Sequence, residues 1–173
     1  MSGRFEKPHA ALADSYRAMV REMHEAGEDL VPFPLSFDNT DFAAFLAKLA
    51  GCERGEGIPE GFVPHSTFWL VDERGEVVAV SNLRHGLTEK LRVEGGHVGY
   101  GVRPSARRRG HATQILRRTL GEARALGIEE ALVTCAATNA GSAGAIRQCG
   151  GRLHSEEYVE SRGQVVSRYL IRT

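Results

Sequence analysis

Residues 97–113 read His-Val-Gly-Tyr-Gly-Val-Arg-Pro-Ser-Ala-Arg-Arg-Arg-Gly-His-Ala-Thr, and this stretch decides the fold that we predict. Its first half has strand-like composition and stops before Pro104, which favours a β-strand. From His111 onward, apolar side chains recur at helical spacing until Gly127, which predicts a helix. The basic turn between strand and helix directs backbone N–H groups outward at the positive end of the helix dipole. We therefore expect an anion-binding site at this turn.

The segments on either side of this stretch indicate a mixed α/β chain. Upstream, we predict a helix over residues 9–26, a second helix capped by Asp38 or Asn39, a glycine- and proline-rich loop over 51–64, and a hairpin with strands at 67–71 and 77–80. Downstream, we predict a buried strand at 131–135, a short helix at 140–149 and a closing hairpin of 152–159 with 164–171. This order predicts one α/β (α+β) domain spanning residues 1–173.

Charge and composition exclude several classes of protein. The chain has 173 residues, and 22 Lys+Arg balance 22 Asp+Glu, so the formal net charge is zero. A neutral chain lacks the general attraction of nucleic-acid binders and polybasic membrane proteins, and we expect neither partner. No stretch reaches the roughly 20 apolar residues of a spanning helix. The three cysteines are far apart and form no C-x-x-C pair, which favours reduced thiols and a cytoplasmic location.

Two short motifs carry a resemblance to a known family. Arg107-x-x-Gly110-x-Ala112 matches the R/Q-x-x-G-x-G/A signature of the GNAT superfamily of acetyl-CoA-dependent N-acetyltransferases, and Asn139-Ala-Gly-Ser142 is similar to its N-x-x-S/A helix start. The resemblance implies a GNAT-like domain: a mixed, mostly antiparallel sheet with a splayed parallel strand pair, flanked by helices. The chain departs from the family at two places. It has Ile146 where many relatives have a tyrosine, and Gly151 where they have a phenylalanine.

The resemblance also implies where acetyl-CoA, the cosubstrate, would bind. Its pantetheine arm would lie in the gap between the splayed strands and its pyrophosphate at the basic turn. The residues that the resemblance assigns to the cosubstrate are the main chain of Tyr100, Gly101 and Val102, the turn residues Arg107, Arg108, Arg109, Gly110, His111, Ala112 and Thr113, and Asn139 and Ser142 near the thiol.

Catalytic residues are less well marked. Acetyl transfer needs an unprotonated amine, and His97 stands where many relatives have a glutamate, so its imidazole is a candidate general base. The alternative is a hydrogen-bonded structural histidine. With Ile146 in place of the usual tyrosine, Ser142, Tyr158 and Cys149 are the candidate general acids, and water is a fourth. Proximity and oxyanion stabilisation carry most of such a reaction, so the missing tyrosine does not abolish it.

The predicted function is transfer of an acetyl group from acetyl-CoA to an amine, by direct attack in a ternary complex. The alternative is a non-catalytic acyl-CoA-binding or sensing module with the same fold; RNA binding through the basic turn is a weaker third reading. No metal site is expected, because the histidines and cysteines show no ligand spacing. Exposed strand edges make a homodimer possible. The acceptor is not encoded in a motif, although His85, Glu89 and Glu94 are candidate contacts for a cationic amine.

Overall fold

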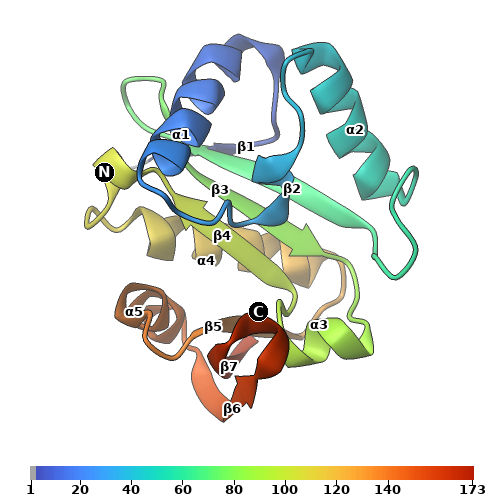
Figure 1. Cartoon of the computed structure of the whole chain (residues 1–173), viewed down its shortest axis with the longest axis vertical. Coiled ribbons are helices and arrows are strands. Elements are labelled where there is room, and N and C mark those ends of the chain that lie inside the picture. Colours follow the sequence, from blue (N-terminus) through green and yellow to red (C-terminus); the bar gives the residue numbers. More distant parts are fainter. Residues whose placement is uncertain (1–2) are drawn as a thin grey trace.

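The computed structural model describes residues 3–173, which form two antiparallel sheets and the helices that cover them (Figure 1). The first sheet has the strand order β1-β2-β3-β4 and the second the order β5-β7-β6. The strands are β1 (Arg4–Glu6), β2 (His65–Val71), β3 (Val77–Arg84), β4 (Val98–Val102), β5 (Glu130–Ala136), β6 (Arg152–Val159) and β7 (Gln164–Arg172). The helices are α1 (Ala13–Glu25), α2 (Phe42–Arg54), α3 (Glu89–Val93), α4 (His111–Ala125) and α5 (Ala140–Gln148). Short 3₁₀ turns span Ala10–Leu12, Phe33–Ser36, Pro104–Ala106 and Glu160–Arg162.

The first sheet is buried on both faces. Trp69 of β2 points toward α1, where its ring stacks on Tyr16 at 4.7 Å between centroids. The neighbouring Phe68 and Leu70 point to the opposite face, in the clusters that contain Leu116 and Ile115 of α4. Because successive side chains of a strand alternate between faces, a strand covered by helices on both sides needs a continuous apolar run. Residues 68–71, Phe-Trp-Leu-Val, supply this apolar run.

Most of the predicted elements are present, with local corrections. The cap of α2 is Asp41, whose carboxylate accepts the Ala44 N–H at 3.0 Å, and not Asp38 or Asn39. The helix continues through the buried Gly51 and ends at Gly55, whose φ of 78° suits a glycine, so the predicted loop starts later than residue 51. The sequence analysis missed β1 and α3, which are only three and five residues long.

Strands β4 and β5 confirm the predicted fold in one respect and correct it in another. They do separate, but so fully that they belong to different sheets, and every ladder among the described residues is antiparallel. The predicted parallel pair therefore forms no ladder. Their one close approach lies just before β4, where the His97 N–H donates to the Leu132 carbonyl at 2.7 Å and Gly96 bridges Val133. Beyond this point the facing edge of β4 pairs with no strand among residues 3–173, which leaves room for a ligand.

Candidate active site

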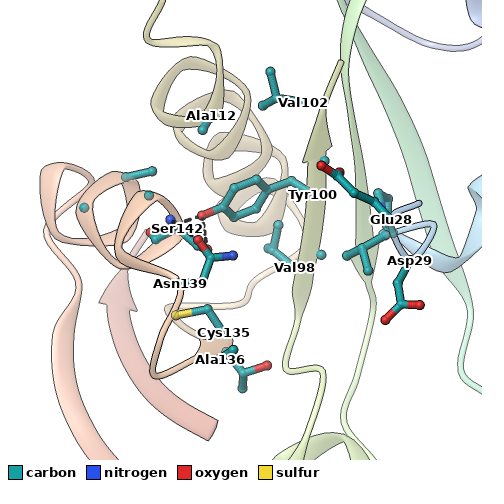
Figure 2. Close-up of a pocket in the computed structure, with 18 of the residues that line it drawn as sticks. Glu28, Asp29, Val98, Tyr100, Val102, Ala112, Cys135, Ala136, Asn139 and Ser142 are labelled. Carbon is teal, nitrogen blue, oxygen red and sulfur yellow. Dashed lines mark hydrogen bonds between the residues drawn. The ribbon is translucent and has the colours of Figure 1, made fainter. Parts of the chain in front are cut away.

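A cleft of about 1220 Å³ opens where β4 and β5 part (Figure 2). Its walls are β4, the end of β5, the basic turn with the first turn of α4, and the start of α5. The segment 28–33, which lies between α1 and α2, packs against β4 and also lines the cleft. The cleft is therefore assembled from segments that are far apart in the sequence.

The β4 wall presents backbone groups to the cleft that pair with no strand of the described structure, although the Val102 carbonyl accepts from Arg107 Nε at 3.2 Å. The Arg103 N–H donates to the Val78 carbonyl at 2.9 Å and the Arg84 N–H to the His97 carbonyl at 2.8 Å, which fixes the hydrogen-bonding phase of the ladder between β3 and β4. By the alternation of an antiparallel ladder, the N–H and C=O of Val98, Tyr100 and Val102 then point away from β3. The main chain of Gly101 points toward β3. Its N–H and C=O therefore do not face the cleft, contrary to the predicted backbone contact with the ligand.

The basic turn is shaped to bind an anion. Arg108 has a φ of 61° and Gly110 one of 83°, so two positions in the turn are left-handed. Such backbone directs consecutive N–H groups into one concave surface. Among residues 3–173, no acceptor is found for the backbone N–H groups of residues 108–113, and no side chain caps α4. The Nδ1 atom of the buried His111 also lacks a partner in this part of the chain. These donors and the helix dipole favour a phosphate-like group.

The three arginines of the turn have different surroundings in the structure. The Arg107 guanidinium forms a bidentate ion pair with Glu28 and also donates from Nε to the Val102 carbonyl at 3.2 Å. This hydrogen-bonded pair holds the pKa of the Glu28 carboxyl below its ordinary value and raises that of Arg107. Arg107 thus ties the turn to the segment 28–33. Arg109 does not line the cleft, whereas Arg108 does.

A hydrogen bond between two hydroxyl groups links β4 to α5 within the cleft. The phenol oxygen of Tyr100 lies 2.8 Å from Ser142 Oγ and donates to the Ser142 carbonyl at 3.3 Å (Figure 2). Burial raises the pKa of Tyr100 well above its ordinary value, so its proton is retained. Asn139 caps α5 by accepting the Ser142 N–H at 2.9 Å through Oδ1. Its amide nitrogen is left to face the cleft, as drawn in Figure 2.

The cleft gathers most of the predicted cosubstrate residues but few of the predicted catalytic ones. Those that line it are Tyr100, Gly101, Val102, Arg107, Arg108, Gly110, His111, Ala112, Thr113, Asn139 and Ser142. Tyr158 lies on β6 with 64% of its surface exposed and does not line the cleft. His97 does not line it either. Cys149 is also absent from its lining, so of the four candidate catalytic side chains only Ser142 lies in the cleft.

His97 is held by β5. Its Nδ1 accepts the Leu132 N–H at 2.9 Å, while burial, with Arg92 and Arg84 nearby, lowers its pKa below the ordinary value. We expect His97→Ala to lower the free energy of unfolding by about 1–2 kcal/mol, the cost of leaving that N–H unpaired, with an unchanged pH profile of kcat/KM. His97→Asn, which offers an acceptor in the same place, should recover part of the stability. Loss of the acidic limb of the profile in both variants would instead assign His97 as the general base.

The end of the cleft away from the basic turn, here called the far end, contains residues that the sequence did not predict to lie together. Arg84 ends β3, and Arg162 lies in the turn between β6 and β7; both line the cleft together with Glu94 and Phe33. Glu94 was a candidate contact for an amine, but its carboxylate accepts from Arg162 Nε at 2.7 Å. No short motif contains these residues, because they converge only through the tertiary fold.

Comparison with known families identifies the cleft. The model of the acetyltransferase (GNAT) family matches residues 28–150, which include the segment 28–33, both cleft strands, the turn and α5. The chain belongs to the GNAT acetyltransferase family. This assignment confirms the predicted enzyme class, an N-acetyltransferase. No curated protein sequence matches the chain.

Solved GNAT structures share the fold over almost the whole chain. The ribosomal-protein-S5-alanine acetyltransferase of Vibrio fischeri has a TM-score of 0.73 at 12% identity, covering 99% of this chain and 93% of that one. RimJ of Mycobacterium smegmatis, solved with a CoA disulfide, has a TM-score of 0.71 at 16% identity, covering 98% and 81%. A phosphinothricin acetyltransferase of Sinorhizobium meliloti, solved with acetyl-CoA, has a TM-score of 0.65 at 15% identity, covering 99% and 89%. At these identities the likeness shows the fold alone.

Two kinds of feature are absent from the described residues. Within residues 3–173, no helix combines the length and apolar character needed to cross a membrane. The same part of the chain holds no group of three or more His, Cys, Asp or Glu side chains that could bind a metal ion.

Proposed function

We propose that this GNAT protein transfers an acetyl group from acetyl-CoA to an amine by direct attack in a ternary complex. The observation that carries the proposal is the left-handed turn at Arg108 and Gly110, whose unpaired N–H groups open into the cleft between β4 and β5. A pyrophosphate fits this donor set, because it supplies the acceptors and the negative charge that the turn lacks. Structural neighbours solved with acetyl-CoA or a CoA disulfide support the same choice of ligand.

The backbone groups of β4 suit the pantetheine arm. An extended chain with amides can pair with the outward N–H and C=O groups of Val98, Tyr100 and Val102 as an added strand would. An N–H of this row directed at the thioester carbonyl would stabilise the oxyanion as the amine attacks. The Asn139 amide would hold the arm near the sulfur. The turn then binds the pyrophosphate through residues 108–113, and Arg107 fixes the turn through Glu28.

The chemistry requires one new bond and one broken bond. The amine nitrogen bonds to the carbonyl carbon, the C–S bond breaks, and the leaving thiolate takes a proton. We assign that proton to the Ser142 hydroxyl, whose own proton is replaced from water in the cleft, while Tyr100 keeps its proton and positions Ser142 through their 2.8 Å contact. The acceptor loses its own proton to water in the cleft, since His97 does not line it. Holding the amine against the thioester supplies much of the acceleration.

The fold supports more than one kind of acceptor. The neighbours named above include an enzyme for the alanine of ribosomal protein S5 and one for phosphinothricin, and both match nearly all of this chain. The choice between a protein amine and a small amine must therefore be made by the residues at the far end of the cleft.

Thiol release tests the proposed function directly. We expect the purified protein, incubated with acetyl-CoA and a broad amine panel, to liberate free CoA with at least one acceptor, above the rate without acceptor. The competing reading, a non-catalytic acyl-CoA-binding module, remains motivated by Ile146, which cannot donate a proton. Tight CoA binding with no thiol release across the panel would establish the module and refute the enzyme.

We also propose a cytoplasmic location. Cys52, Cys135 and Cys149 are all free thiols in the described structure, and two of them are buried. Unpaired thiols are typical of a reducing compartment. Localisation of a tagged protein by fractionation would test this.

A further inference from the structure

Arg84 is a cation at the far end of the cleft without a counter-charge. It ends β3, and its Nη1 donates to the carbonyl oxygens of Gly95 and Gly96, each at 3.0 Å. Carbonyl groups orient a guanidinium but do not neutralise it. Among residues 3–173, no carboxylate oxygen lies within 4.0 Å of Arg84, and its Nε and Nη2 donate to no described residue.

The surroundings of Arg84 make this missing partner costly. The Phe33 ring lies 5.8 Å from its Cζ, and Pro32 and Gly99 pack nearby. Burial, and then the charge of Arg162, lower the pKa of Arg84 to about 10, so it is still protonated at neutral pH. Arg84 is half-buried, so it has lost part of its hydration, and a guanidinium in such a place normally has an ionic partner that offsets this loss. A cleft arginine held in this way is a common means of binding a ligand anion.

The neighbouring carboxylates do not act as the ionic partner of Arg84. Glu94 is buried, and its Oε2 accepts from Arg162 Nε at 2.7 Å and from Ser161 Oγ at 3.3 Å. Its charge is thus matched by Arg162. Asp29 lines the cleft but is exposed and forms no ion pair with Arg84 in the described structure. Arg84, Arg162 and Glu94 together leave one positive charge beside the space where the acceptor must enter.

We propose that the acceptor amine also carries an acidic group, a carboxylate or similar oxyanion, and that Arg84 binds this group through Nε and Nη2. The inference rests on the proposed acetyl transfer and narrows its acceptor to amino acids and related amino acid-like compounds. An acceptor with further amines and no acid would instead bring positive charge toward Arg84 and Arg162. Polyamines are therefore expected to be poor acceptors.

Matched acceptor pairs test this inference. The panel contains amino acids with one to four carbon atoms between amine and carboxylate, each paired with its neutral primary amide. Thiol release is measured for every pair at saturating acetyl-CoA. We expect at least one acid to exceed its own amide in kcat/KM by about ten-fold or more, the size of a charge-assisted hydrogen bond. Amides equal to or better than their acids throughout the panel would overturn the proposal.

Two substitutions assign the preference to Arg84. Arg84→Gln should lower kcat/KM for the preferred acid by about ten- to a hundred-fold, leave the amide within about two-fold, and leave the KM for acetyl-CoA unchanged. Arg84→Lys, which keeps a charge, should restore part of the preference. Arg92→Gln is the matched control, since Arg92 is an exposed arginine of α3 outside the cleft. Equal losses for acid and amide in Arg84→Gln would show a purely structural role and contradict the proposal.

A binding measurement separates this inference from the proposed function. N-acetyl amino acids and their amides are titrated by calorimetry into protein saturated with CoA. We expect the acids to bind more tightly than the amides in the wild type and equally weakly in Arg84→Gln. This difference in affinity can be measured even if no thiol is released. That combination of results would refute the proposed acetyl transfer and support the anion site at Arg84. No difference between wild type and Arg84→Gln would refute the anion site whatever the activity.

Discussion

Replacing Ala112 by glutamate is expected to raise the KM for acetyl-CoA by about 100-fold, with little effect on folding. Ala112 lies in the first turn of α4 and lines the cleft beside the unpaired N–H groups. A carboxylate at this place would accept those N–H groups itself and repel the pyrophosphate at short range, where the effective dielectric constant is low. A glutamate in the first turn also favours the helix dipole, so α4 should be stabilised by about 0.3–1 kcal/mol.

Because Ala112→Glu should weaken acetyl-CoA binding while it stabilises α4, a loss of binding in this variant cannot be attributed to unfolding. Initial rates at varied acetyl-CoA give KM, and thermal unfolding gives the stability. Ala125→Glu, the same substitution at an exposed position of α4, controls for the added negative charge. If Ala112→Glu bound acetyl-CoA as tightly as the wild type, the turn would not be the pyrophosphate site.

Gly101→Ala is expected to lower kcat/KM by about 100-fold and the free energy of unfolding by about 2–3 kcal/mol. A Cβ at residue 101 would overlap the carbonyl oxygen of Val31 and come within 3.2 Å of the Met23 Cε. The obstacle is backbone, so the segment 28–33 must move, which strains packed structure. That segment packs against β4 and lines the cleft, so a displacement of about 1 Å there would misplace the acceptor.

A second glycine provides the control for Gly101→Ala. Gly121 is exposed in α4, and a Cβ there meets nothing within 4 Å. Gly121→Ala should therefore raise stability by about 0.5–1 kcal/mol, because alanine favours a helix over glycine. Activity should be unchanged. Normal activity in Gly101→Ala would mean that the segment 28–33 does not form part of the acceptor site.

The sequence was most informative where chemistry and local structure depend on neighbouring residues. The motif from Arg107 to Ala112 predicted both a strand-turn-helix and an anion site, because left-handed turns and helix starts are local features. The Asn139 cap of α5 is local in the same sense, since its partner Ser142 is three residues away. These parts of the site could be assigned before any fold was known.

Features made by distant residues could not be predicted. Arg107 appeared to be a phosphate ligand, but its partner is Glu28, which is 79 residues away. Arg84 has Phe33 as a neighbour and no ionic partner, because the nearby Glu94 forms its ion pair with Arg162. Tyr158 seemed close to the site on the order of elements alone, yet β6 is the edge strand of the second sheet and directs it to solvent. Charge balance within a cleft is set by tertiary contacts and has no signature in sequence.

A crystal structure of the protein with bound CoA tests the central claim most directly. We expect the pyrophosphate within hydrogen-bond distance of the backbone N–H groups of residues 108–113, and the pantetheine arm between β4 and β5 along Val98, Tyr100 and Val102. The sulfur should then lie near Ser142. A CoA molecule bound outside this cleft, or with its pyrophosphate away from the turn, would contradict the account.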